Sequence, residues 1–74
     1  MTGVTKSQRD IIRSIKETIR TISGESGGQA RVEEVIDVLV QQGFARDKIE
    51  YTLDHLKRGG EVLEPRRGLV KLIG

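Results

Sequence analysis

Four side chains in the second half of the chain could do chemistry together. Steps of three, four and three residues place them on one face of a helix, and they are Lys48, Tyr51, His55 and Arg58. The two cations can bind phosphate or carboxylate oxygens, and the two rings offer flat faces for stacking. We therefore treat this face as a candidate contact to DNA or to a partner protein.

Carboxylates lie beside this face at Asp47, Glu50 and Asp54. Carboxylates near phosphates oppose the electrostatic attraction that supplies most of the non-specific affinity for DNA. Asn and Gln, which pair well with adenine, are absent from this segment. Direct base reading by this helix is thus the weaker of the two interpretations.

Two adjacent arginines, Arg66 and Arg67, form a second candidate contact. They stand between Pro65 and Gly68, residues that favour a tight chain reversal. At a turn they would remain in water, where they could bind phosphates, enter a DNA minor groove or pair with carboxylates of another protein. They could also be no more than a polar turn.

A third basic surface follows the first helix-forming segment, with cations at Arg9, Arg13, Lys16 and Arg20. This spacing forms one stripe on a helix. The stripe is either a solvated face or a contact to phosphate or to an acidic surface.

No catalytic, cofactor-binding or metal site is expected. The chain has one histidine and no cysteine, which rules out most zinc sites. Its glycine-rich stretch at 24–28 lacks the Lys-Ser/Thr pair of a phosphate-binding loop. We therefore predict that this chain is not an enzyme by itself.

Apolar periodicity indicates the elements that must position these residues. It predicts helices over 7–23, 32–40 and 46–58, strands over 61–63 and 69–73, and a short edge strand near 29–31. The second helix has apolar residues at Val32, Val35, Ile36, Leu39 and Val40. Thr5 or Ser7 is the expected N-cap of the first helix, and Gly24 its left-handed C-cap. Pro65 is expected to end the first strand.

This order predicts an α+β winged helix-turn-helix: three helices, a C-terminal two-stranded wing and a short third strand near 29–31. Residues 1–6 are expected to be a flexible tail or linker, and 7–74 the winged-helix domain. With 74 residues, the domain must hold through aliphatic packing, because no disulfide or metal can assist.

Charge divides the chain unevenly. The net charge is +2, with +3 on residues 1–23, −3 on 24–44, and +1 on each of 45–60 and 61–74. We expect no membrane contact and no signal peptide, since no apolar run is long enough. The expectation is a cytoplasmic protein and, for this domain alone, a monomer.

Three stretches of sequence carry a resemblance to a known family. They are Val32–Ile36, Ile49–Pro65 and Gly68–Ile73. Together they resemble the C-terminal winged-helix domain of archaeal minichromosome maintenance (MCM) replicative helicases. The segment from Leu56 to Pro65, followed by a turn and an aliphatic strand with Lys71, is the most specific part.

The resemblance implies a parent protein that unwinds DNA in replication, with its ATP-binding sites in an AAA+ motor domain outside this chain. It implies a regulatory tail that tunes the motor and docks origin-recognition or loader proteins. It also implies weak or no DNA binding by the isolated domain. The alternatives from the residues themselves are a DNA-binding winged-helix module, as in a small transcription regulator, and a winged-helix dimer.

Overall fold

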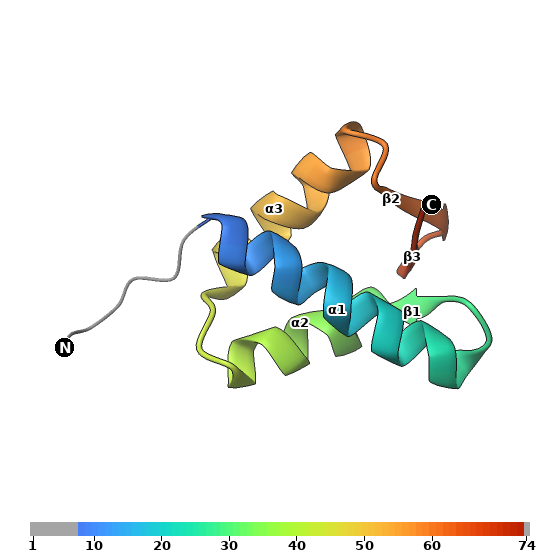
Figure 1. Cartoon of the computed structure of the whole chain (residues 1–74), viewed down its shortest axis with the longest axis horizontal. Coiled ribbons are helices and arrows are strands. Elements are labelled where there is room, and N and C mark those ends of the chain that lie inside the picture. The colour runs from blue at the N-terminus through green and yellow to red at the C-terminus, as the bar shows by residue number, and fades with distance from the viewer. Residues whose placement is uncertain (1–7, 74) are drawn as a thin grey trace, which may run out of the picture.

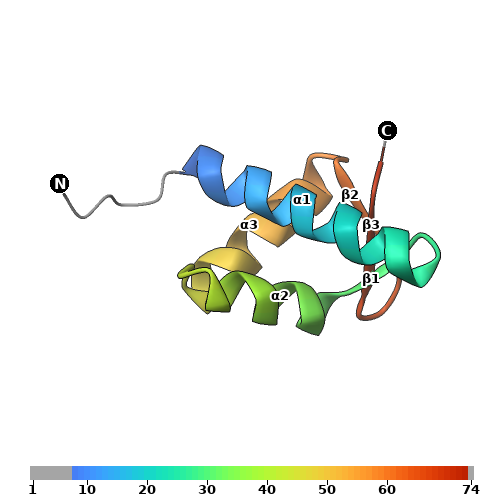
Figure 2. The ribbon, with the colours of Figure 1, turned by 60° about the horizontal axis from the view of Figure 1, so that its bottom comes forward.

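Three helices and three short strands make up the computed structural model, which describes residues 8–73. The helices are α1 (Gln8–Ser26), α2 (Val32–Gln41) and α3 (Arg46–Arg58). The strands are β1 (Ala30–Arg31), β2 (Val62–Arg66) and β3 (Leu69–Leu72). Figures 1 and 2 together show the helices side by side around a common interior, with the strands gathered far from the start of α1.

The strands form one antiparallel sheet in the order β1-β3-β2. β3 is the central strand, so β1 pairs with a strand that is distant from it in the sequence. Ala30 lies opposite Val70, and Val62 lies opposite Leu72. This is the α+β architecture of a winged helix-turn-helix, and the predicted fold class, including the short third strand, is confirmed.

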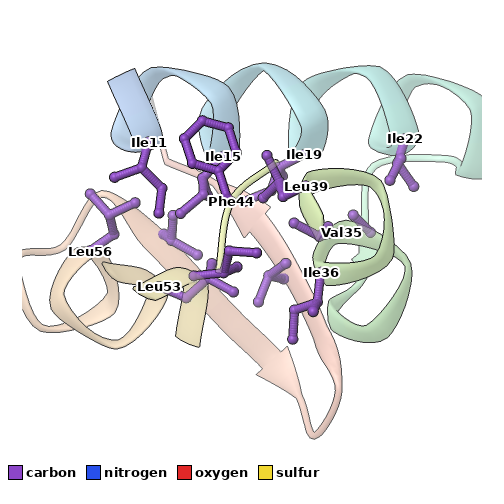
Figure 3. Close-up of a cluster of buried hydrophobic side chains, with 14 residues drawn as sticks. Ile11, Ile15, Ile19, Ile22, Val35, Ile36, Leu39, Phe44, Leu53 and Leu56 are labelled. Atoms are coloured by element: carbon purple, nitrogen blue, oxygen red, sulfur yellow. The ribbon is translucent and has the colours of Figure 1, made fainter. Parts of the chain in front are cut away.

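The core is aliphatic and is built around α1. Its Ile11, Ile15, Ile19 and Ile22 are buried against side chains from α2, α3 and the sheet (Figure 3). Phe44, from the turn between α2 and α3, is buried beside them. A spacing of three or four residues places the isoleucines on one stripe of α1, so one helix contacts every other layer.

Two glycines with positive φ lie where α2 and α3 end. Gly43 has φ 104°, and the next N–H, that of Phe44, donates to the Leu39 carbonyl at 3.1 Å. Gly60 has φ 79°, and Glu61 N–H donates to the Leu56 carbonyl at 3.0 Å. Both are the left-handed terminations that glycine favours. They direct the chain from α2 into α3 and from α3 into the wing.

The end of α1 was wrongly predicted. Gly24 lies inside the helix, which continues to Ser26, and the positive φ values occur at Gly27 and Gly28. A single glycine only lowers helix propensity, so the helix ends where two glycines allow the chain to turn back toward β1. The expected N-caps, Thr5 and Ser7, and the expected tail at 1–6 lie outside the described residues.

The first wing strand also differs from the prediction. It runs from Val62 to Arg66, so Pro65 does not end it. The ladder between β2 and β3 is irregular between Leu63 and Arg66. Such a bulge, on an edge strand, tolerates a residue that has no N–H to donate. The second strand ends at Leu72, one residue earlier than predicted.

Val40 is the one predicted core residue of α2 that lies in solvent, at 44% exposure. Val35, Ile36 and Leu39 are buried, while Val32 is half-buried. An α-helix turns by about 100° per residue. Val40 therefore lies at the edge of the arc of the helix circumference that the buried residues occupy. Val38, on the other margin, packs partly against the core instead.

Substitution of Leu53 tests which face of α3 is buried in the core. It is 4% exposed between α3 and the rest of the core, so Leu53→Ala should lower the free energy of unfolding by about 2–5 kcal/mol. Urea denaturation measures this. The matched control is Val40→Ala, whose effect should stay below about 1 kcal/mol. An equal effect of the two substitutions would contradict the assignment of the buried face.

Candidate interaction surfaces

The predicted face of α3 is exposed along its length. Lys48, Tyr51, His55 and Arg58 all lie in solvent. The rings of Tyr51 and His55 stack on each other, with centroids 6.5 Å apart and planes inclined by 14°. Tyr51 is 69% exposed, so it does not pack against the wing. The face therefore presents a small aromatic platform flanked by charged groups.

Most cations of α3 already have carboxylate partners. Arg58 forms an ion pair with Asp54 at 3.0 Å, and Arg46 donates to Glu50 at 3.1 Å and to Glu33 of α2 at 3.3 Å. These hydrogen bonds, to Glu50 first and then to Glu33, raise the pKa of Arg46. Lys48 has no ion-pair partner among residues 8–73.

A glutamate organises the wing. Glu64 accepts hydrogen bonds from the Gly68 N–H at 2.9 Å and from Lys57 Nζ of α3 at 3.0 Å. It therefore closes the turn and joins the hairpin to α3. Stabilisation of the carboxylate by the Gly68 N–H, and then by Lys57, lowers the pKa of Glu64.

The two wing arginines occupy different positions. Arg66 is the last residue of β2, and Arg67 lies in the two-residue turn that Gly68 completes with φ 85°. Both are exposed, and neither has an ion-pair partner in the described part of the chain. The structure thus places both near the tip of the wing, in water.

The four cations of the basic stripe of α1 differ in their exposure and pairing. Arg9, Arg13 and Arg20 are exposed. Lys16 is half-buried and pairs with Glu61, in the connection between α3 and β2. One of the four cations of the stripe is therefore used to hold α1 against the start of the wing.

The structure brings some of these groups together and keeps others apart. Arg67 shares a groove with Leu53, Asp54, Lys57 and Glu64, so the wing turn and one side of α3 face each other. The cations of the α1 stripe line a separate shallow groove with Ile12.

Sequence reasoning missed the partners Arg46, Lys57, Glu61 and Glu64. The i, i+4 spacing of Arg46 with Glu50 and of Asp54 with Arg58 was a signal available in the sequence. The three pairs that join separate elements, Arg46–Glu33, Lys16–Glu61 and Lys57–Glu64, have no such signal in the sequence.

The described residues contain neither a metal-binding cluster nor a membrane-spanning helix. Within residues 8–73, no group of three His, Asp or Glu side chains could hold a metal ion. No helix of that range has the length and apolar character to cross a membrane.

The wing glutamate generates a pH-dependent prediction. Because its pKa is lowered on folding, Glu64 contributes stability that is present above its unfolded pKa, about 4.3, and is lost as pH falls through the lower folded value. Glu64→Gln should therefore reduce the thermal midpoint at pH 7, and this difference should shrink as pH falls below about 4. Thermal denaturation from pH 2 to 7 measures it. Glu34→Gln, at an exposed carboxylate of α2, is the control; an equal loss in both would contradict the role of Glu64.

The sequence of this chain also has similarity to a known protein. No family model matches the chain. The chain is 29% identical over 72 residues to an uncharacterized MCM-type protein of Methanocaldococcus jannaschii, an alignment that covers 96% of the chain and 10% of the relative. The chain thus spans about a tenth of the length of that relative. The similarity supports an MCM-related small domain.

Proposed function

We propose that this chain is a non-catalytic regulatory and docking domain of an MCM-related replication protein. It would bind the AAA+ motor of its parent, or origin-recognition and loader proteins, and so tune ATP hydrolysis and DNA unwinding. The similarity to an MCM-type protein supports the family side of this proposal. The charges of α3 support the docking side.

One observation carries the choice of docking over DNA binding. In a helix-turn-helix the last helix of the trio enters the major groove, and here that helix is α3. Arg46 and Arg58 are paired with carboxylates of α2 or α3, and Lys57 is paired with Glu64. Binding to phosphates would have to break or compete with these pairs, while Asp47 adds another negative charge to the same helix.

The mechanism is a shift of population. A tethered domain that binds one state of the motor better than another biases the motor toward that state by its differential affinity. A short flexible tether supplies an effective concentration on the millimolar scale, so even a weak contact is substantially occupied. A small surface is then sufficient, and no large interface is needed.

An ATPase assay tests this proposal. The purified chain, added in trans to the MCM motor of the same organism, should change its steady-state ATPase rate in a saturable manner. Charge reversal at one of three surfaces should abolish the change: Arg9→Glu with Arg13→Glu, Lys48→Glu, or Arg67→Glu. Glu34→Gln is the control that should retain it. A rate that stays constant up to about 1 mM chain, the concentration scale of a short tether, would rule the proposal out.

DNA binding is the second candidate, and a different observation favours it. The exposed stack of Tyr51 on His55 offers a surface on which an unpaired base could stack. Unpaired cations at Lys48, Arg66 and Arg67 lie on the same helix or on the wing.

Titration of labelled duplex and single-stranded DNA at two salt concentrations distinguishes the two candidates. The docking role predicts dissociation constants weaker than about 1 μM near physiological salt, in the range of non-specific binding. Tighter binding that Arg66→Ala with Arg67→Ala abolishes, or that Tyr51→Ala weakens for single strands alone, would favour DNA. The salt slope then counts phosphate contacts, at about −0.9 for each on duplex DNA.

A further inference from the structure

The sheet has one face toward the helices and one face away from them. Val62 and Val70 are buried in the core, and Leu72 packs partly against it. Side chains alternate between faces along a strand, so Leu69 and Lys71 lie on the opposite side of the central strand β3. Ile73 follows the strand directly, and its N–H donates to the Glu61 carbonyl at 3.1 Å, which continues the same alternation one residue further. Residues directly opposite each other in an antiparallel ladder share a face. The pairing therefore defines what else lies there.

That pairing brings cations and aliphatics together. Leu69 lies opposite Arg31 on one side and Arg66 on the other, and Leu63 lies opposite Lys71. We name this set the outer sheet face, and its members are Arg31, Leu63, Arg66, Leu69, Lys71 and Ile73.

The irregularity in β2 is what places Arg66 on the outer sheet face. Leu63 and Arg66 are three residues apart, whereas their partners Lys71 and Leu69 are two apart. Without an extra residue, side chains three apart on a strand would point to opposite faces. The bulge at Glu64 and Pro65 supplies that residue. It places Arg66 beside the aliphatic side chains, while Glu64 turns to Lys57 and the Gly68 N–H.

The aliphatic part of this face is exposed. Leu63 is 44% and Ile73 is 49% exposed, and Leu69 is half-buried. Leu63 lies diagonally across from both Leu69 and Ile73, a distance that long side chains bridge. The solvated face of an antiparallel sheet is usually polar, so three aliphatic residues gathered there form an apolar patch.

The charged part of the face has one sign. Arg31, Arg66 and Lys71 have no ion-pair partner within residues 8–73, and the described strands contribute no carboxylate to this side. Three acids of α2, Glu33, Glu34 and Asp37, line a groove with Arg31 and Leu69 at one border of the face. Away from that border, the surroundings favour a ligand with negative charge.

Apolar and cationic groups together identify the kind of partner. A nucleic-acid backbone would pair with the three cations but would leave Leu63 and Ile73 without apolar contacts. A peptide that carries both aliphatic side chains and carboxylates satisfies both groups at once. Buried aliphatic contacts would supply affinity, and the surrounding charge pairs would select the partner.

We propose that the outer sheet face binds an acidic amphipathic segment of a partner protein, with aliphatic side chains of that segment on Leu63, Leu69 and Ile73 and its carboxylates toward Arg31, Arg66 and Lys71. This proposal rests on the docking function proposed above and adds to it a further contact surface and the chemistry of the partner that this surface binds. The surface is separate from the exposed face of α3 and from the stripe of α1.

Selection from a displayed library of random 20-residue peptides tests it. The immobilised chain should enrich peptides that combine Leu, Ile or Phe with Asp and Glu. A synthetic copy of an enriched peptide should shift the backbone amide resonances of 63, 66, 69 and 71. Leu63→Ser with Ile73→Ser should weaken its binding by about tenfold or more, as expected for loss of central apolar contacts. Arg31→Glu with Lys71→Glu should do the same.

Val40→Ser is the matched control, because Val40 has the same 44% exposure as Leu63 but lies on α2. It should leave peptide affinity unchanged, and thermal midpoints near that of the parent chain would show that the variants fold. Failure to enrich any peptide, enrichment of peptides without carboxylates, or equal binding to the Leu63→Ser, Ile73→Ser variant would overturn the proposal.

A 20-base-pair duplex, titrated in parallel, tests the other class of ligand. If DNA shifts the same amides and the serine variant binds it normally, the face is a nucleic-acid site and the proposal is wrong. These outcomes need no motor domain. They are therefore distinguishable from an absence of effect on ATP hydrolysis, which would contradict only the proposed regulatory role.

Discussion

The stripe of isoleucines on α1 is the contact on which the rest of the structure depends. Ile11, Ile15, Ile19 and Ile22 pack at once against α2, α3 and the sheet, and the chain has no cysteine to cross-link those layers. A domain of this size has one core and little stability to spare. Its interior is therefore filled by aliphatic packing, and the candidate functional groups are confined to the surface.

Ion pairs within the domain determine which of its surface cations remain available to contact a ligand. Lys16 with Glu61 and Lys57 with Glu64 connect helices to the wing, and Arg46 connects α3 to α2. Exposed pairs of this kind contribute little stability each, but they occupy cations that a DNA-binding helix would direct at phosphates. Lys48 is the one cation of α3 without an ion-pair partner in the described chain, and the other such cations lie along α1, at the wing turn and across the outer sheet face. The distribution of charge, more than its total of +2, is therefore the basis for the docking role that we propose.

Local signals in the sequence were sufficient for most of the fold. The bounds of α3, the left-handed Gly43, Gly60 and Gly68, and the order of elements all follow from apolar spacing and turn chemistry. The failures occurred where tertiary structure decides. α1 continues through Gly24 because the chain needs two flexible residues, Gly27 and Gly28, to return to β1. The outer sheet face could not be predicted, since it depends on a cross-strand register that no single segment encodes.

The Glu64-Pro65 pair links these observations, because it is part of the most specific motif in the resemblance to MCM tails. In the structure, Glu64 accepts from the Gly68 N–H and from Lys57, while Pro65 lies in the bulge that turns Arg66 toward Leu63 and Leu69. The geometry of the hairpin alone is therefore sufficient to explain the presence of Glu64 and Pro65. The same bulge determines the character of the outer sheet face, because it adds Arg66 to the three aliphatics and two cations that the regular ladder places there.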